Sequence, residues 1–114
     1  MSDLWEIKRH DTAPPLPLHL TSTDPVTKVT SDIDLSTATK VRVIIARSSG
    51  DTPIVDREVA DRPADGRLLF AWEPGDTDVD GVWQAEVEIT WGDGTIQTVP
   101  GGGYATFKIV PDLG

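Results

Sequence analysis

Cysteine is absent from the sequence, which excludes disulfide bonds, thiolate metal sites and a cysteine nucleophile. Basic residues are also scarce, because ten lysines and arginines stand against 19 aspartates and glutamates and leave a net charge of −9. Proteins that bind nucleic acid or anionic lipid need a basic surface. We therefore expect neither nucleic acid nor a membrane as a partner.

Long apolar runs are missing as well, since no segment approaches the ~18 apolar residues that a membrane-spanning helix needs. The first residues, Met1 to Glu6, lack the basic start and the apolar stretch of a signal peptide. The 114 residues match the size of one domain and suffice for a core without disulfides. We expect a single domain over residues 1–114 that is made in a cytoplasm and assembled there.

The acidic charge is unevenly distributed along the chain. Residues 1–57 hold seven basic and eight acidic residues, whereas residues 58–114 hold three basic and eleven acidic residues. The second half should therefore carry an acidic, well-solvated surface that promotes solubility. A partner is expected to contact the near-neutral first half.

Apolar and polar residues alternate at a period of two, which is typical of half-buried strands. The clearest case is residues 83–91, where the odd positions are apolar and the even positions are polar. Gly-Asp-Gly at 92–94 separates this run from a second one at 95–99, and such a loop predicts a β-hairpin. Weaker alternation predicts further strands at residues 5–8, 40–47, 52–59, 67–72 and 104–110.

Turn residues separate these strands at intervals of about 8–12 residues, the spacing found in sandwiches and barrels. No segment shows helical periodicity together with capping residues. We predict an all-β fold, an immunoglobulin-like sandwich of about seven strands in two antiparallel sheets. Within it, residues 52–59 should pair with the strand before them and with the strand after them.

Residues 11–34 interrupt this pattern, because they are rich in proline, threonine, serine and aspartate. Leu16, Leu18 and Leu20 alternate, so a short edge strand is expected there, and proline is tolerated on an edge. The rest is expected to form a loop, and long loops of this kind often contact partners. The interface candidates are Pro14, Pro15, Leu16 and Leu18 from this segment, together with Trp5.

The four tryptophans divide between core and interface. Trp83 and Trp91 share the apolar face of one predicted strand and Trp72 lies on another, so we expect these three in or beside the core. Trp5 lies near the N-terminus, where an aromatic side chain is a good anchor for a partner. A carbohydrate-binding surface would need an exposed row of rings, and the alternation predicts that most rings point inward.

Asp76, Asp78 and Asp80 precede Gly81 and repeat the alternate carboxylates that begin a calcium-binding loop. The bidentate glutamate that closes such a loop is missing, because Val87 stands at its position. An aspartate-rich turn that leads into a strand explains the same residues. We therefore expect no metal and no cofactor, and these three aspartates are the only candidate ligands.

No catalytic residues are predicted. His10 and His19 match no metal-ligand spacing, and Asp11 would point to the opposite face of a strand from its neighbour His10. Glu86 and Glu88 lie on the predicted solvent-facing side of one strand, where acidic residues usually serve solubility. We expect a protein without enzymatic activity.

Several segments resemble, in order and spacing, the N-terminal β-sandwich module of BppU-like upper-baseplate proteins, which are siphophage tail components. The resemblance covers most of the chain and consists largely of strand and turn sequences. The matching segments are residues 6–12 (EIKRHDT), 35–43 (LSTATKVRV), 72–78 (WEPGDTD), 81–87 (GVWQAEV), 93–94 (DG), 98–100 (TVP) and 103–109 (GYATFKI).

This resemblance implies a non-enzymatic, immunoglobulin-like virion component that docks onto other phage structural proteins, in several copies within a symmetric assembly. In that family a longer C-terminal part carries the receptor-binding machinery, whereas the present sequence ends at Gly114. We therefore expect a stand-alone minor tail or baseplate protein. A capsid decoration or head–tail connection protein is the alternative within this class. A host-surface carbohydrate-binding module, calcium-assisted through the three aspartates, is the alternative from another class.

Overall fold

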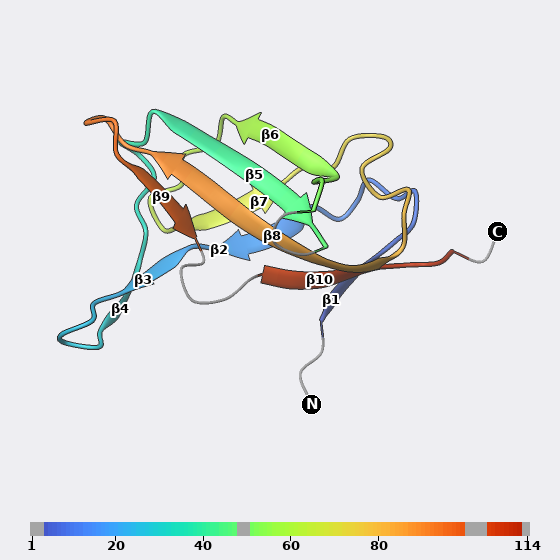
Figure 1. Cartoon of the computed structure of the whole chain (residues 1–114), viewed down its shortest axis with the longest axis horizontal. Coiled ribbons are helices and arrows are strands. Elements are labelled where there is room, and N and C mark those ends of the chain that lie inside the picture. Colours follow the sequence, from blue (N-terminus) through green and yellow to red (C-terminus); the bar gives the residue numbers. More distant parts are fainter. Residues whose placement is uncertain (1–3, 48–50, 100–104, 113–114) are drawn as a thin grey trace.

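The computed structural model describes residues 4–47, 51–99 and 105–112, and these residues form ten strands and no helix (Figure 1). The fold is therefore all-β, as predicted. The strands are β1 (Trp5–Lys8), β2 (Leu16–His19), β3 (Thr21–Thr23), β4 (Thr30–Asp32), β5 (Lys40–Ala46), β6 (Val55–Val59), β7 (Arg67–Phe70), β8 (Gly81–Thr90), β9 (Ile96–Val99) and β10 (Ala105–Val110).

The strands form three sheets rather than the two that were predicted. A six-stranded sheet has the order β1-β10-β8-β5-β6, with β9 also paired to β8, and two further sheets consist of β2–β7 and β3–β4. The pair β1–β10 is parallel and all other pairs are antiparallel. Nearly the whole chain lies between β1 and β10, which supplies the long crossover that a parallel pair needs. The expectation of about seven strands in two antiparallel sheets is therefore not confirmed.

Strand β8 is the centre of the six-stranded sheet, and it has the predicted alternation. Its buried residues are Trp83, Ala85, Val87 and Ile89, while Glu86 and Glu88 on the other face are only half-buried. The predicted hairpin to β9 is also confirmed, because the Trp91 amide donates to the carbonyl oxygen of Thr95 at 2.9 Å. Alternation of this kind buries one face of a sheet and leaves the other to solvent.

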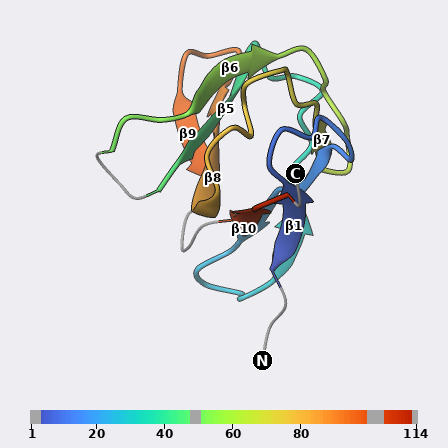
Figure 2. The same ribbon diagram turned by 90° about the vertical axis from the view of Figure 1, so that its right-hand side faces the viewer.

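The core lies between the six-stranded sheet and the β2–β7 sheet. In Figure 2, β7 lies on the opposite side of the molecule from β5, β8 and β9. Phe70 and Trp72 meet edge to face with 5.2 Å between their ring centroids, and Trp72 lies 5.7 Å from Phe107 of the larger sheet. These rings join the two sheets, because each aromatic ring buries a large apolar area on contact with the other sheet.

Strand β6 is shorter than the predicted strand 52–59, and it pairs with β5 but not with β7. The connection of residues 60–66, which contains Pro63 and Gly66, carries the chain to the other sheet, where β7 pairs with β2. There Leu68 and Phe70 cover the core. The expectation that this strand pairs with both of its chain neighbours was therefore wrong, because the next strand, β7, belongs to the other sheet and pairs with β2.

The segment 11–34 contains more structure than the loop that was predicted. The expected edge strand is β2, whose Leu16 and Leu18 face the core. Beyond it, β3 and β4 pair in a hairpin with Thr21 opposite Asp32 and Thr23 opposite Thr30. We call residues 21–32 the arm, because in Figure 1 this hairpin extends away from the other strands. The loop prediction failed because residues 21–23 and 30–32, on either side of the turn at 24–29, pair as two short polar strands.

The arm joins the rest of the molecule next to Gly66, which has a positive φ of 72°. The Leu20 amide donates to the carbonyl oxygen of Gly66 at 2.8 Å, and the Ile33 amide donates to the carbonyl oxygen of Leu20 at 2.9 Å. A Cβ atom at position 66 would lie 2.5 Å from the Leu20 carbonyl oxygen. Only glycine fits both the backbone conformation and this close approach.

We predict that Gly66→Ala destabilises the protein more than Gly94→Ala does. Gly94 also has a positive φ, 88°, but open space surrounds its Cβ position. Gly94→Ala should therefore lose about 1–2 kcal/mol from the left-handed backbone alone, whereas Gly66→Ala adds a clash with backbone. Chemical denaturation measures both free energies of unfolding. Equal losses in the two variants would contradict the close approach at Gly66.

Candidate docking surface

The structure separates the five interface candidates. Leu16 and Leu18 are only 3% and 5% exposed, because both point from β2 into the core, so their side chains are not available to a partner. Pro14 and Pro15 are exposed between β1 and β2. Trp5 is half-buried and meets Phe107 edge to face at 6.2 Å. The candidates therefore do not form one continuous surface.

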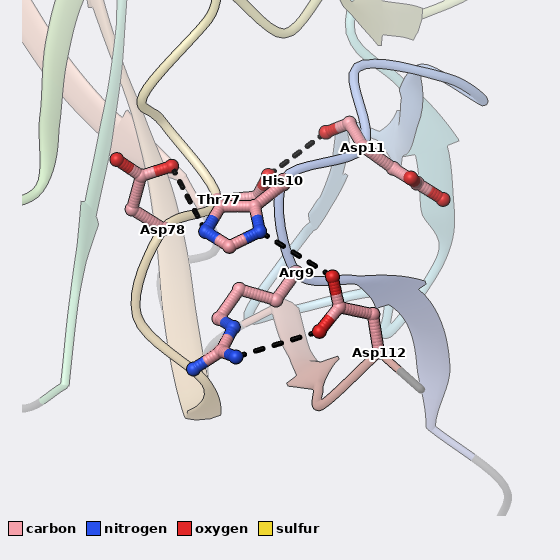
Figure 3. A network of polar contacts seen from close by, with 6 residues as sticks. All are labelled: Arg9, His10, Asp11, Thr77, Asp78 and Asp112. Atoms are coloured by element: carbon pink, nitrogen blue, oxygen red, sulfur yellow. Dashed lines mark hydrogen bonds and ion pairs between the residues drawn. The ribbon is translucent and has the colours of Figure 1, made fainter. Parts of the chain in front are cut away.

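The chain between β1 and β2 is held by the loop that precedes β8 (Figure 3). The His10 amide donates to the carbonyl oxygen of Thr77 at 3.2 Å. The Thr77 hydroxyl donates in return to the carbonyl oxygen of Asp11 at 2.8 Å. Thr77 is 1% exposed, so its buried hydroxyl and carbonyl oxygen both find partners in this exchange.

Charged side chains continue this network toward the end of β10. Asp112 lies 3.4 Å from the Arg9 guanidinium and 3.4 Å from Nδ1 of His10, while Asp78 lies 3.8 Å from Nε2 of His10. Desolvation, which would raise the pKa of Asp112, is outweighed by the hydrogen bond from His10 and by the charge of Arg9, so that pKa is lowered. The network joins three chain segments and is an anchor for the N-terminal region.

The three candidate calcium ligands do not converge. Both carboxylate oxygens of Asp76 accept from Nη2 of Arg57 at 2.8 Å, and one also accepts from the Glu73 amide. Asp78 faces His10, as Figure 3 shows, and Asp80 is exposed. Within residues 4–47, 51–99 and 105–112, no group of three or more histidine, aspartate or glutamate side chains could hold a metal ion.

We predict that calcium leaves the melting temperature unchanged, because Arg57 already occupies the Asp76 carboxylate. Asp76→Asn should instead lower the free energy of unfolding by about 1.5–3 kcal/mol, the usual contribution of a charged hydrogen bond. Asp80→Asn is the matched control, since its side chain is exposed. Thermal unfolding with CaCl₂ and with a chelator measures these effects. A saturable rise in melting temperature that Asp76→Asn abolishes would contradict this assignment.

The tryptophans form no exposed row among the described residues. Trp72 and Trp83 are 6% and 3% exposed, as expected for core residues. Trp91 is half-buried and donates from its indole to the Gln97 side chain at 3.1 Å, and Trp5 is half-buried as well. A flat aromatic platform for sugar binding therefore has no support in this part of the chain.

The turn of the arm is ordered by Asp24. Its Oδ1 accepts from the amides of Val26 at 2.8 Å and Thr27 at 3.0 Å. Backbone hydrogen bonds close the turn. The Lys28 amide donates to the carbonyl oxygen of Asp24, and the Asp24 amide donates to the carbonyl oxygen of Val29, both at 2.9 Å. The hydrogen bonds from Thr27 and Val26 lower the pKa of Asp24, so the carboxylate is charged at neutral pH.

Two apolar side chains are presented to solvent by this ordered turn. Val26 is 86% exposed and Val29 is 59% exposed, and Val26 has the highest exposure of the large hydrophobic residues described. Lys28 lies between them with a positive φ of 63° and is exposed. A single exposed valine is ordinary, but two on a fixed, projecting turn make this turn a candidate contact element that is already ordered.

The sequence interpretation missed this contact element. The signal was present in Asp24-Pro25, which is turn chemistry between the threonine-containing segments 21–23 and 29–30. Its strands are polar on both faces, so hydrophobic alternation could not reveal them. The arm therefore replaces Leu16 and Leu18 as an interface candidate within the 11–34 segment.

Comparisons with known proteins add no relative. No protein-family model matches the chain, and no curated protein or solved structure shows significant similarity to it. No helix among the described residues is long and apolar enough to span a membrane.

Proposed function

We propose that the chain is a non-enzymatic, immunoglobulin-like structural module of a bacteriophage particle, a minor tail or baseplate component that docks onto a larger assembly through its arm. The sequence resemblance to upper-baseplate modules supports the phage assignment. In this proposal several copies assemble symmetrically onto the particle in the host cytoplasm, and other phage structural proteins are the partners.

The strand order supports the immunoglobulin-like part of this proposal. In variable-type immunoglobulin domains, strands G, F, C and C′ lie side by side in one sheet, and strands B and E are neighbours in the other. The order β10-β8-β5-β6 corresponds to the first set and the pair β2–β7 to the second, also in chain order. The β3–β4 arm then lies between B and C, and β9 lies between F and G.

The arm is the observation that carries the docking proposal. Val26 and Val29 are exposed on a turn that is already fixed by Asp24, so binding would order few additional side chains. The arm also belongs to the near-neutral half of the chain, which a partner can approach with little charge repulsion.

A capsid decoration or head–tail connection protein would use the same docking element at another place in the particle. Fractionation of heads and tails distinguishes these alternatives from the tail assignment, because the protein follows the fraction to which it is attached.

We predict that the protein is present in purified particles. The Val26→Asp variant should no longer be incorporated into them. A charged side chain at the tip would have to be desolvated in the contact. Val82→Asp is the matched control, because Val82 is 49% exposed on the outer face of the six-stranded sheet, away from the arm. Immunoblots of gradient-purified particles, made with each variant supplied in place of the wild type, measure incorporation.

Absence of the wild-type protein from particles would overturn the virion assignment. Equal incorporation of Val26→Asp and wild type would overturn docking through the arm. Thermal unfolding of both variants checks that the substitutions leave the fold intact.

A further inference from the structure

The two strands of the arm differ from the other strands, because they are polar and contribute little to the core. The three residues of β4 are all exposed, and in β3 only Thr21 is half-buried. Threonine, serine and aspartate make up both strands, so neither face of the hairpin is apolar. The arm is therefore open to solvent along most of its length.

The backbone of this hairpin alternates between groups that bond across it and groups that point away from it. The Asp24 amide donates to the carbonyl oxygen of Val29, and the Ile33 amide donates to the carbonyl oxygen of Leu20, both at 2.9 Å. In an antiparallel pair, hydrogen-bonded pairs of residues alternate with pairs that are not bonded to each other. The central pair of β3 and β4 lies two residues from each of these bonds, so it also bonds across the hairpin.

Thr30 and Asp32 are the residues of β4 that direct their amide and carbonyl groups outward. They oppose Thr23 and Thr21, and these two pairs lie on either side of the bonded central pair. The hydroxyl oxygens of Thr23 and Thr30 are 2.9 Å apart, which fits the closer approach of a pair without backbone bonds. Within the described part of the chain, β4 pairs with β3 alone. Its outer edge is therefore a row of backbone donors and acceptors without a strand beside it.

The outer edge of β3 is less accessible than that of β4. Thr21 lines an apolar pocket together with Val99 and Ala105, and it is half-buried there. Since β4 is exposed at every residue, its edge is the one that a partner can approach.

The β4 edge also lacks the features by which proteins protect sheet edges, namely proline, lysine, bulges and inward-pointing charge. Its sequence is Thr-Ser-Asp, and its register with β3 is regular. An unprotected edge is a template for another strand. A third strand would also stabilise the arm, because a two-stranded hairpin by itself is marginal in water.

We propose that the arm docks by adding its β4 edge to an exposed edge strand of another particle protein. In this mode of recognition, main-chain hydrogen bonds supply the affinity. Val29, which directly precedes β4, and Val26 at the turn add apolar contact beside the joined strands. The inference rests on the proposed function, because it assigns the way in which the arm contacts its partner.

The charge of the arm specifies a partner strand that carries lysine or arginine. Residues 21–34 hold three aspartates and one lysine. Asp32 and Asp34 are exposed on β4 and directly after it, and Asp32 pairs with His19 through one carboxylate oxygen, which leaves the other oxygen available. Opposite charges across paired strands are stabilising and like charges are destabilising. Exposed edge strands commonly carry lysine, whereas a second copy of this chain would bring aspartates together.

Proline substitution tests the edge directly, because proline has no backbone amide to donate. Thr30→Pro removes an outward amide of β4 and keeps the bonds to β3, so this variant is expected to be lost from purified particles. Thr23→Pro is the matched control, because it removes the outward amide of the opposed residue on β3 and should be incorporated like wild type. Slow hydrogen exchange of the Asp24 and Ile33 amides establishes that the hairpin is intact in both variants.

Selective loss of Thr30→Pro from particles supports strand addition through β4. Retention of Thr30→Pro would overturn it, and so would loss of both variants or of Thr23→Pro alone, because none of these results singles out the β4 edge.

Hydrogen exchange of the wild type provides a readout without substitutions. The amides of Thr30 and Asp32 are expected to exchange rapidly in the isolated protein and to become protected in intact particles, whereas the Thr23 amide should exchange rapidly in both. Exchange is quenched before the particles are dissociated, and fragmentation mass spectrometry locates the deuterium. Unchanged exchange at Thr30 and Asp32 in particles would contradict the inference.

A change of charge tests the chemistry of the partner strand. Asp32→Lys should be incorporated less than wild type, because it would place a cation against the basic side chains of the partner. Asp80→Lys makes the same change of charge at an exposed position outside the arm and should be incorporated like wild type. Equal incorporation of the two variants would overturn the basic partner strand.

The two proposals fail in different ways. Absence of the wild-type protein from particles overturns the proposed function and this inference with it. If the wild type is present and Thr30→Pro is incorporated equally well, strand addition alone is overturned and docking through the tip of the arm stands.

Discussion

The close approach of Gly66 to the backbone of Leu20 and Ile33 is the constraint on which the arm depends. At this point the connection to β7, the end of β2 and the return from β4 share backbone hydrogen bonds, and no side chain fits between them. The same backbone contacts therefore hold the arm in position relative to the β2–β7 sheet. Without this junction the β3–β4 hairpin would be an isolated pair of short strands, and such hairpins are marginal in water.

Three other strand edges, those of β6, β2 and β1, carry features that discourage pairing with other chains. Arg57 on the edge strand β6 points inward, where it bonds to Asp76 and lies 5.1 Å from the Phe70 ring centroid. Pro17 on β2 lacks an amide donor, and β1 carries charged residues on its outer face. Proline and inward-pointing charge are known protections of sheet edges. These features favour the proposed docking through the arm over docking through these three edges.

The sequence predicted what hydrophobic alternation can encode, namely the all-β class, the strands of the main sheet and the β8–β9 hairpin. Alternation shows which face of a strand is buried, but it does not show which strand is the neighbour, so the separation of β6 from β7 was missed. The inward direction of Leu16 and Leu18 was readable from their spacing. Their assignment to an interface came from the proline-rich context, and burial in the core overrode it. The arm was invisible because its strands bury almost nothing.

The central claim is that the arm is a preformed element rather than a chain that orders only on binding. Backbone ¹⁵N relaxation of the isolated protein tests it most directly. The account predicts order parameters near the rigid-backbone value of about 0.85 from Thr23 to Val29, similar to those of β5. Values below about 0.6 at Val26 and Thr27, with β5 rigid, would contradict it.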